Sequence, residues 1–413
     1  VVAQLYAAAN PDRTEALVLD APIDRTLPMT EFWVEAAKGF EGVLATTLSA
    51  CSRYQECQAA VPDAGHALDR IRAAADADGR ISAEVTGTDG VPRARVVSMR
   101  AVEATALRMM YDQTGRMLLL RALAGTSAGD LRRLVRLVDV EGGGAHAATF
   151  AYFATWCADV RAAPGHRTDD FTGYVNVAAQ AGIPAGGARD IAWATAACVF
   201  WPGQPAGSDP PPEATTVPSL ILTATEDPIT PPSQAHSVLD RLPDARLVET
   251  QGGDHGSLGA PCPNEFMADF LAGGRLPYGR ISLCDGSVVG DFVPLAPTPA
   301  RGADDAVLGL VWEIVGAPEV VEWSGTYELK VGCGDGGRMT IGVPGPDGRS
   351  EITFEQCSWA AGAVFDGTGT MDLGSWDADL ALESPRGSLT LRGRGESRHV
   401  TGTWDGARVD LEP

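Results

Sequence analysis

Two apolar segments on either side of an amphipathic one constrain the fold of this chain most strongly. Residues 217–231, "VPSLILTATEDPITP", begin as an apolar strand and end in an acidic turn. Residues 233–244, "SQAHSVLDRLPD", have helical periodicity, and residues 245–256, "ARLVETQGGDHG", are a second strand that ends in a glycine-rich loop. A strand, a helix and a strand in succession are typical of a parallel sheet with crossover helices. These residues therefore predict an α/β domain.

The first residues predict another step of such a sheet. Residues 1–9 are small and apolar, as in a helix, but no capping residue precedes them. Asn10 and Pro11 end the helix, and residues 16–19 form an apolar run suited to a buried strand. Because a helix followed by a buried strand continues a parallel sheet, we expect a strand-like segment before Val1.

The rest of the chain divides into segments that differ in the spacing of their apolar residues. Residues 30–198 have mainly helical spacing, and the proline-rich stretch "WPGQPAGSDPPPEATT" follows them as a surface loop. A linker starts near residue 286, and "DDAVLGLVWEIVG" reads as one helix. Residues 324–413 are short alternating runs separated by turn residues. Period-two patterns at this spacing predict an antiparallel β-sandwich or small barrel.

Composition excludes two classes of protein. The 413 residues include 54 acidic and 32 basic side chains, which gives a formal net charge of −22. A surface this acidic repels phosphate groups, so we expect no nucleic-acid partner. No run of about 18 apolar residues is present, so the sequence predicts no transmembrane segment.

The cysteines indicate disulfides rather than a metal site. No C-x-x-C is present and no histidine stands at ligand spacing from a cysteine pair, so we expect no zinc or other metal. The even count fits four pairs of sequence neighbours: Cys51–Cys57, Cys157–Cys198, Cys262–Cys284 and Cys333–Cys357. Such pairing indicates an oxidising compartment outside the cytoplasm, with buried free thiols as the alternative.

Asp227 and His255 are the candidate catalytic residues. Each follows a predicted parallel strand, and catalytic groups of open α/β sheets gather at the carboxyl ends of the strands. Their order and placement match the acid and base of an α/β-hydrolase, whose triad runs Ser, Asp, His along the chain. Asp254 and Glu226 are rival carboxylates, which we interpret as solvent-facing loop residues. Thr230 is expected either to hydrogen-bond near Asp227 or to cap the following helix.

The serine of such a triad is not evident. Residues 125–129 match G-x-S-x-G around Ser127, and they precede Asp227 and His255 in the chain. A nucleophile elbow, however, needs a buried strand before it and a tightly packed helix after it. The preceding "RMLLLRAL" reads as a helix and the following "DLRRLVRLV" is charged and amphipathic. Ser127 is therefore expected in a turn between helices or as a helix cap, and not as the nucleophile.

Several blocks of the first 300 or so residues resemble the secreted tripeptidyl (prolyl-type) aminopeptidases of the α/β-hydrolase superfamily. The blocks are "VAQLYAAANPDRTEALVLDAPID", "CSRYQECQAAVPD", "YFATWCAD", "VPSLILTATEDPITPP", "DARLVETQGGDHG" and "CDGSVVGDFVPL". In that family a Gly-x-Ser-Tyr-Gly-Gly elbow runs into the segment that resembles residues 1–24. The resemblance implies a nucleophile roughly four to six residues before Val1. The family commonly has Gly directly before the histidine, where this chain has Asp254.

The resemblance also implies a domain plan. Residues 1–30 and 200–285 would be the second half of an α/β-hydrolase core, and residues 31–199 a large helical cap over the substrate pocket. Residues 286–323 would be a linker and a helix, and residues 324–413 an all-β C-terminal domain. The expected fold class is thus α/β, with a partial hydrolase core followed by a β domain.

The activity implied by the resemblance is removal of short peptides from free N-termini by Ser-His-Asp acyl transfer, without a cofactor. Asp227 and His255 would be triad members, and Asp159 is the candidate that holds the ammonium group of the substrate. The partners would be a peptide substrate and an upstream segment carrying the nucleophile, so we expect this chain alone to be inactive. The location would be secreted or at the cell surface. A carboxylesterase and a non-catalytic secreted binding protein are the alternatives.

Overall fold

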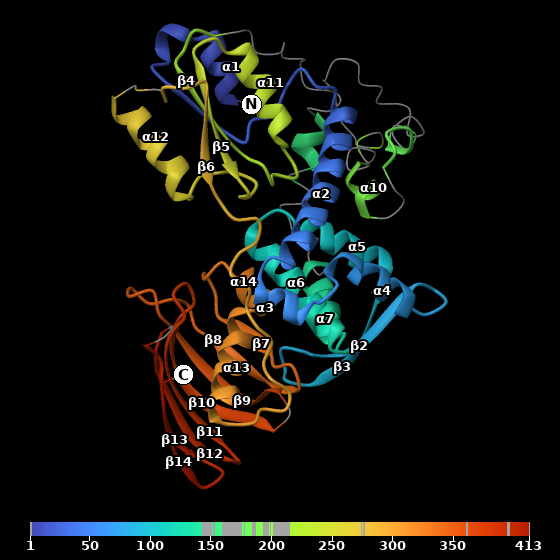
Figure 1. The fold of residues 1–413 in the computed structure, drawn as a ribbon, viewed down its shortest axis with the longest axis vertical. Coiled ribbons are helices and arrows are strands. Elements are labelled where there is room, and N and C mark those ends of the chain that lie inside the picture. Colours follow the sequence, from blue (N-terminus) through green and yellow to red (C-terminus); the bar gives the residue numbers. More distant parts are fainter. Residues whose placement is uncertain are drawn as a thin grey trace. The chain divides into compact units, whose positions relative to one another are not determined.

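The computed structural model describes residues 2–142, 151, 153–158, 176, 178–183, 187–192, 198, 200, 215–273, 275, 277–360, 362–394 and 397–412 (Figure 1). The chain forms two compact units, each made from separate stretches of sequence. The parallel-sheet unit comprises Val1–Arg53, Glu103–Met117 and Gly143–Gly290. The antiparallel-sheet unit comprises Tyr54–Val102, Leu118–Gly142 and Asp291–Pro413.

The parallel-sheet unit contains the predicted α/β arrangement. Its strands are β1 (Leu17–Asp20), β4 (Ser219–Ala224), β5 (Ala245–Gln251) and β6 (Ile281–Asp285), in the order β1-β4-β5-β6. All three pairings are parallel. The carboxyl ends of the four strands therefore lie at one edge of the sheet, where the loops carrying Asp227 and His255 emerge.

Helices cover both faces of this sheet. Alternate residues along each strand point to opposite faces, so Leu19, Ile221 and Leu247 share one buried cluster while Leu222 and Val248 share another. Helices α1 (Val2–Ala9) and α11 (Pro232–Arg241) contribute to the first cluster, and α12 (Pro261–Gly273) to the second (Figure 1). The long helix α2 (Met29–Cys51) and the short α10 (Gly187–Ala192) contact each other in the same unit. Strand β4 is buried along its whole length because both of its faces are covered.

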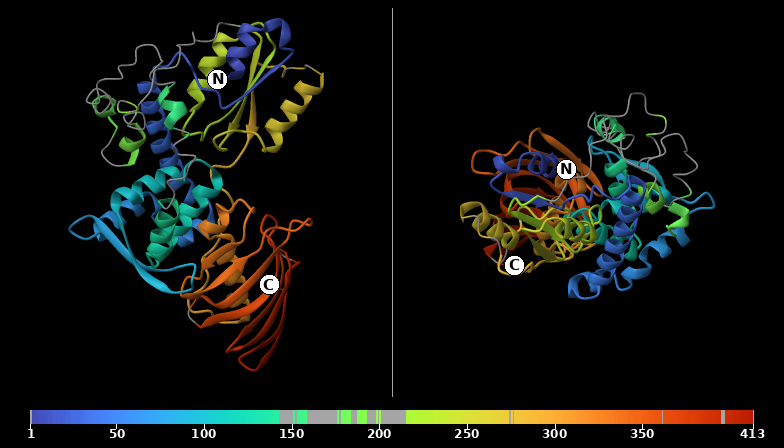
Figure 2. Two further views of the ribbon diagram at one scale, coloured as in Figure 1. Left: turned by 180° about the vertical axis from the view of Figure 1, so that it is seen from behind. Right: turned by 90° about the horizontal axis from the view of Figure 1, so that it is seen from above.

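The C-terminal strands of the antiparallel-sheet unit form one sheet. The strands are β7 (Leu329–Gly332), β8 (Gly336–Ile341), β9 (Ser350–Ala360), β10 (Ala363–Asp372), β11 (Asp377–Ser384), β12 (Gly387–Gly393), β13 (His399–Trp404) and β14 (Ala407–Leu411). Each strand pairs antiparallel with the next in sequence, so the described residues form a meander of eight strands (Figure 2). Helix α13 (Ala303–Val315), predicted from "DDAVLGLVWEIVG", contacts β9, β12 and β13.

The remaining elements of this unit are helices and one hairpin. The helices are α3 (Gln55–Ala60), α4 (Ala67–Ala74), α7 (Arg132–Gly142) and α14 (Pro318–Val321), with parts of α5 (Met99–Arg108) and α6 (Gln113–Ser127). Strands β2 (Arg80–Thr86) and β3 (Pro92–Ser98) pair antiparallel within the stretch for which the sequence predicts mainly helices. The structure differs from the prediction there, because "RISAEVT" and "PRARVVS" alternate on either side of a glycine-containing turn.

The predicted disulfides are present. Cys157–Cys198, Cys262–Cys284 and Cys333–Cys357 are bonded as the sequence indicates, and Cys51 and Cys57 are disulfide-bonded cysteines as well. None of the helices in the described part of the chain combines the length and the apolar composition that a membrane crossing requires. The disulfides fit an extracellular protein.

A buried carboxylate ties the loop after β1 to helix α11. Asp24 accepts hydrogen bonds from Thr26 Oγ1 (2.7 Å), from Ser237 Oγ (2.6 Å) and from Arg241 Nη2 (2.7 Å). Burial raises the pKa of Asp24, but the hydrogen bonds from Ser237, Thr26 and Arg241 more than offset it, so its pKa lies below the usual value. The carboxylate therefore stabilises the folded state above its ordinary pKa, and this stabilisation is lost as the pH falls through the lowered value.

Replacing Asp24 by Asn is expected to lower the free energy of unfolding by about 1–3 kcal/mol at pH 7, because charged hydrogen bonds from partly buried donors are lost. Urea unfolding at several pH values would measure the difference, which should begin to shrink below about pH 4 and approach zero only below the lowered pKa of Asp24 in the folded protein. Asp12→Asn, at an exposed position, serves as the control. A loss of equal size at pH 7 and at pH 3 would contradict the charge-based explanation.

Candidate active site

Asp227 lies in the turn directly after β4. Its side chain is fully buried and is held on both oxygens by its own loop. The backbone N–H groups of Ile229 (3.0 Å) and Thr230 (2.9 Å) donate to Oδ1, and Thr230 Oγ1 donates to Oδ2 (2.7 Å). Thr230 thus hydrogen-bonds to Asp227, one of its two expected roles. Donors on both oxygens fix the orientation of a carboxylate before any substrate arrives.

A close approach of helix α2 supports this turn. A Cβ atom at Gly39 would lie 2.4 Å from the carbonyl oxygen of Pro228, the residue after Asp227. Only glycine leaves room for the loop at this distance. Nothing in the helical pattern of α2 indicates which loop packs against Gly39, so its role could not be predicted from the sequence.

His255 lies in the loop after β5 and faces Asp227. Its Nδ1 atom is 3.0 Å from both carboxylate oxygens of Asp227, so the acid and base candidates are in contact. The side chain is 36% exposed, and no described residue hydrogen-bonds to its Nε2 atom. A carboxylate that accepts the Nδ1 proton leaves the lone pair on Nε2, which is the tautomer of a general base.

Tyr111 packs against the histidine. Its backbone carbonyl accepts the His255 N–H (3.0 Å), and the two rings meet edge to face with centroids 5.5 Å apart. The ring of Phe40 also packs against the ring of Tyr111, with their centroids 5.4 Å apart. Burial raises the pKa of Tyr111, and the charge of Asp227 raises it further, so the phenol is neutral at physiological pH. Tyr111 therefore positions the imidazole rather than exchanging protons with it.

Asp20, the last residue of β1, fixes the segment after the histidine. Its carboxylate accepts the N–H groups of Ser257 (2.8 Å) and Leu258 (3.1 Å). This role of Asp20 was not predicted from the sequence, although an acidic residue that ends a buried strand is a signal for it. Three strand ends, those of β1, β4 and β5, thus contribute to holding the Asp227–His255 pair.

Arg116, on helix α6, joins the two loops that carry this pair. Its side chain is completely buried, and all five of its N–H donors are used. The guanidinium donates to the backbone carbonyls of Glu226 (2.6 Å), Gly253 (2.7 Å), Val288 (2.9 Å) and Met110 (2.8 Å). Glu226 precedes Asp227, and Gly253 lies two residues before His255. One side chain therefore sets the spacing of both loops.

Asp254 and Glu226, the alternatives to Asp227 as the catalytic carboxylate, lie near Arg116. Asp254 lies 3.7 Å from Arg116 Nη1 and is about one-third exposed. Burial raises the pKa of Asp254, although the Arg116 charge opposes the rise. Burial likewise raises the pKa of Glu226. Within the described residues, neither side chain forms a hydrogen bond to the imidazole of His255.

The other candidate residues do not join this site in the described part of the chain. Ser127 ends helix α6, and its hydroxyl donates to the carbonyl of Leu123 (3.0 Å) within that helix. The preceding segment is helical, as predicted, and so lacks the strand of a nucleophile elbow. Asp159 lies outside the described residues.

Part of the chain matches a known protein family. Residues 184–283 match a family described as TAP-like protein, within the α/β-hydrolases. The matched residues include β4, α11, β5 and the start of β6, and they include Asp227 and His255. It supports kinship of this part of the chain with α/β-hydrolases. No curated protein matches the chain.

Proposed function

We propose that this protein is a secreted serine hydrolase that releases short peptides from free N-termini. The observation that carries the proposal is the contact between His255 Nδ1 and both oxygens of the buried Asp227 at the carboxyl edge of a parallel sheet. The match of residues 184–283 to the TAP-like family supports the hydrolase class. The disulfides support a location outside the cytoplasm.

The mechanism follows from the protonation of the pair. His255 Nε2 accepts the proton of a serine hydroxyl as its oxygen bonds to the carbonyl carbon of the scissile peptide bond. The imidazolium is stabilised by Asp227 and then gives the proton to the leaving amine, which breaks the C–N bond and leaves an acyl-enzyme. Water, deprotonated in turn by His255, hydrolyses the ester and restores the serine.

The remaining parts of the mechanism rest on the resemblance to tripeptidyl aminopeptidases. The serine is proposed to come from a segment before Val1, which would also supply the N–H groups of the oxyanion hole. Asp159 is proposed to bind the ammonium group of the substrate. The same triad would hydrolyse esters, so peptide and ester substrates must be compared directly.

Fluorophosphonate labelling of the protein made from its complete reading frame tests this function. We expect one labelled serine, located by mass spectrometry, whose labelling is lost in His255→Ala and unchanged in Ser127→Ala. A tripeptide amide should be cleaved and its N-acetylated form should not, because the ammonium group is blocked. Labelling of Ser127 would overturn the assignment of the nucleophile. No labelling in any form would favour a non-catalytic binding protein.

A further inference from the structure

Strand β14 is a free edge of the antiparallel sheet. It lies at one end of the eight-stranded order, and within the described residues it pairs only with β13 (Figure 1). Their register runs without a shift over five residue pairs, and β14 contains neither proline nor glycine. Proline, bulges and coverage by other segments are means by which proteins keep an edge strand from pairing with another chain. Four of the five residues of β14 are exposed, so the strand can accept a further strand.

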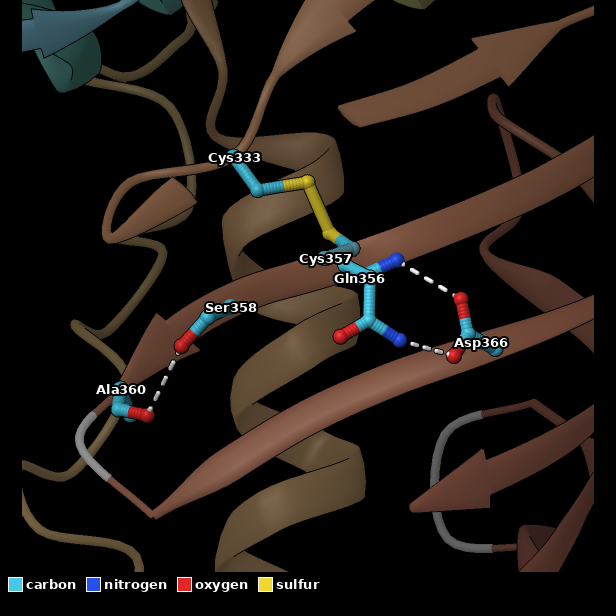
Figure 3. Close-up of a disulfide and its surroundings, with 6 residues drawn as sticks. All are labelled: Cys333, Gln356, Cys357, Ser358, Ala360 and Asp366. Carbon is cyan, nitrogen blue, oxygen red and sulfur yellow. Dashed lines mark hydrogen bonds between the residues drawn. A yellow bond between two sulfur atoms is a disulfide. The ribbon is translucent and has the colours of Figure 1, made fainter. Parts of the chain in front are cut away.

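The opposite edge of the same sheet, β7, is crowded by other segments of the unit. Three of its four residues are buried. A Cβ atom at Gly332 would lie 2.2 Å from the carbonyl oxygen of Thr86, so the end of β2 packs directly on β7, and helix α14 contacts it as well. The Cys333–Cys357 disulfide ties the residue after β7 to strand β9 (Figure 3). Of the two ends of the sheet, β14 is therefore the accessible one.

The turn between β13 and β14 determines which backbone groups face the free edge. Its two residues, 405 and 406, have positive φ angles of 51° and 78°, as in a two-residue hairpin turn. In such a hairpin the pair that flanks the turn exchanges both backbone hydrogen bonds, and bonded pairs recur at every second residue. The odd-numbered residues of β14 therefore bond to β13. The N–H and C=O groups of Arg408 and Asp410 point away from β13, toward the free edge.

The two residues with outward-facing backbone groups carry opposite charges. The side chains of Arg408 and Asp410 are exposed, and they share one face of the sheet because side chains alternate along a strand. Oδ1 of Asp410 lies 2.7 Å from Nε2 of His399 on β13. Within the part of the chain that the structure describes, Arg408 has no ion pair. An exposed arginine without a carboxylate is thus fixed on the free edge, two positions from an aspartate.

This arrangement complements a second copy of the same strand. If two copies of β14 pair antiparallel about a two-fold axis at Val409, Arg408 of each copy lies opposite the partner's Asp410. The opposed residues are those with outward N–H and C=O groups, so each pair also exchanges both backbone hydrogen bonds. On the other face Ala407 lies opposite the partner's Leu411, which is 38% exposed. An axis at Arg408 or at Asp410 would place like charges opposite each other, so the charges select one register.

We propose that two copies of this protein associate by antiparallel pairing of their β14 strands, which joins two eight-stranded sheets into one. The net charge of −22 opposes association of two copies in general, but the charges of Arg408 and Asp410 balance each other at this edge. Pairing of one strand per copy buries less than the ~1,200 Å² of stable complexes, so we expect a dissociation constant on the order of 1–100 μM. The proposal does not depend on hydrolase activity, because β14 belongs to the antiparallel-sheet unit.

Sedimentation velocity of the protein made from its complete reading frame, at concentrations from about 1 μM to about 500 μM, tests the proposal. We expect a concentration-dependent equilibrium between monomer and dimer. Arg408→Asp and Asp410→Arg each place like charges opposite each other, so each variant is expected to raise the dissociation constant about tenfold or more. An equimolar mixture of the two variants restores opposite charges in both pairs. We expect the mixture to associate about as tightly as the wild type.

Arg392→Asp is the matched control, because the Arg392 side chain is 72% exposed on β12 of the same sheet but does not lie on its edge. Its dissociation constant should equal that of the wild type. Leu283→Asp changes β6, the edge strand of the parallel sheet, where Leu283 is 65% exposed. This variant is also expected to associate like the wild type. Far-ultraviolet circular dichroism checks that each variant is folded.

Four results would overturn the proposal. They are no dimer at the highest concentration, equal weakening in Arg408→Asp and Arg392→Asp, loss of the dimer in Leu283→Asp with none in Arg408→Asp, and a mixture that associates no better than its two components. If either charge variant fails to fold, the other is compared alone with the wild type, and an unchanged dissociation constant in it overturns the proposal.

Discussion

Replacing Asp227 by Asn is expected to lower kcat of the protein made from its complete reading frame by about 10⁴-fold, with little change in KM. The carboxylate accepts the Nδ1 proton of His255 at 3.0 Å. An amide in its place can present its NH₂ group to Nδ1, which shifts the imidazole proton to Nε2, the atom that must accept the serine proton. Steady-state hydrolysis of a tripeptide amide measures the effect.

Asp254→Asn and Glu226→Gln are the matched controls for this prediction. Both carboxylates lie next in sequence to a member of the pair, yet in the described structure neither hydrogen-bonds to the imidazole. We expect each variant to retain kcat within about tenfold of the wild type. A larger loss in Asp254→Asn than in Asp227→Asn would assign the orienting carboxylate to Asp254 instead.

Replacing Arg116 by Met is expected to lower the free energy of unfolding by about 3–5 kcal/mol, because four carbonyl groups lose their donor at a completely buried site. Urea unfolding followed by circular dichroism measures the loss. Arg280→Met is the control, since Arg280 is 57% exposed and pairs with the exposed Asp240. The free energy of unfolding of that variant should change by no more than about 0.5 kcal/mol.

Arg116→Lys separates the charge of Arg116 from its geometry. Lysine keeps the charge but has three donors on one atom, which cannot reach carbonyls from the separate loops of Glu226, Gly253 and Val288. We therefore expect Arg116→Lys to be folded but to have a lower kcat, with KM changed less. Full kcat in this variant would show that the loops hold Asp227 and His255 in position without the guanidinium.

The sequence predicted those parts of the fold that short-range patterns determine. The apolar run of β4, the helix α11 and the strand β5 are each visible in about ten residues, and their succession determines that the strands are parallel. The ends of parallel strands lie at one edge, so Asp227 and His255 were predicted near each other without knowledge of the distance. The alternating runs after residue 324 likewise predicted strands, but a period of two does not determine how many sheets they form.

The supporting residues could not be predicted in the same way. Arg116 lies in a helix, and it bonds to carbonyls 110, 137 and 172 positions away. Backbone carbonyls are present at every position, so no pattern in the sequence indicates which of them a buried arginine will reach. Gly39 could not be predicted either, because its role depends on the loop that packs against it. The β2–β3 hairpin, in contrast, has a local alternation that could have been recognised.

The two sheets differ in how far apart in sequence their strands lie, and this determines the order in which they can form. Every strand from β7 to β13 pairs with its immediate successor, whereas Leu17 of β1 pairs with Ser219 of β4, 202 positions later. Closing a longer loop costs more chain entropy, and pairing between distant segments is slow. We therefore expect the C-terminal meander to be protected from hydrogen exchange early in refolding, and the sheet that holds Asp227 and His255 to be completed last.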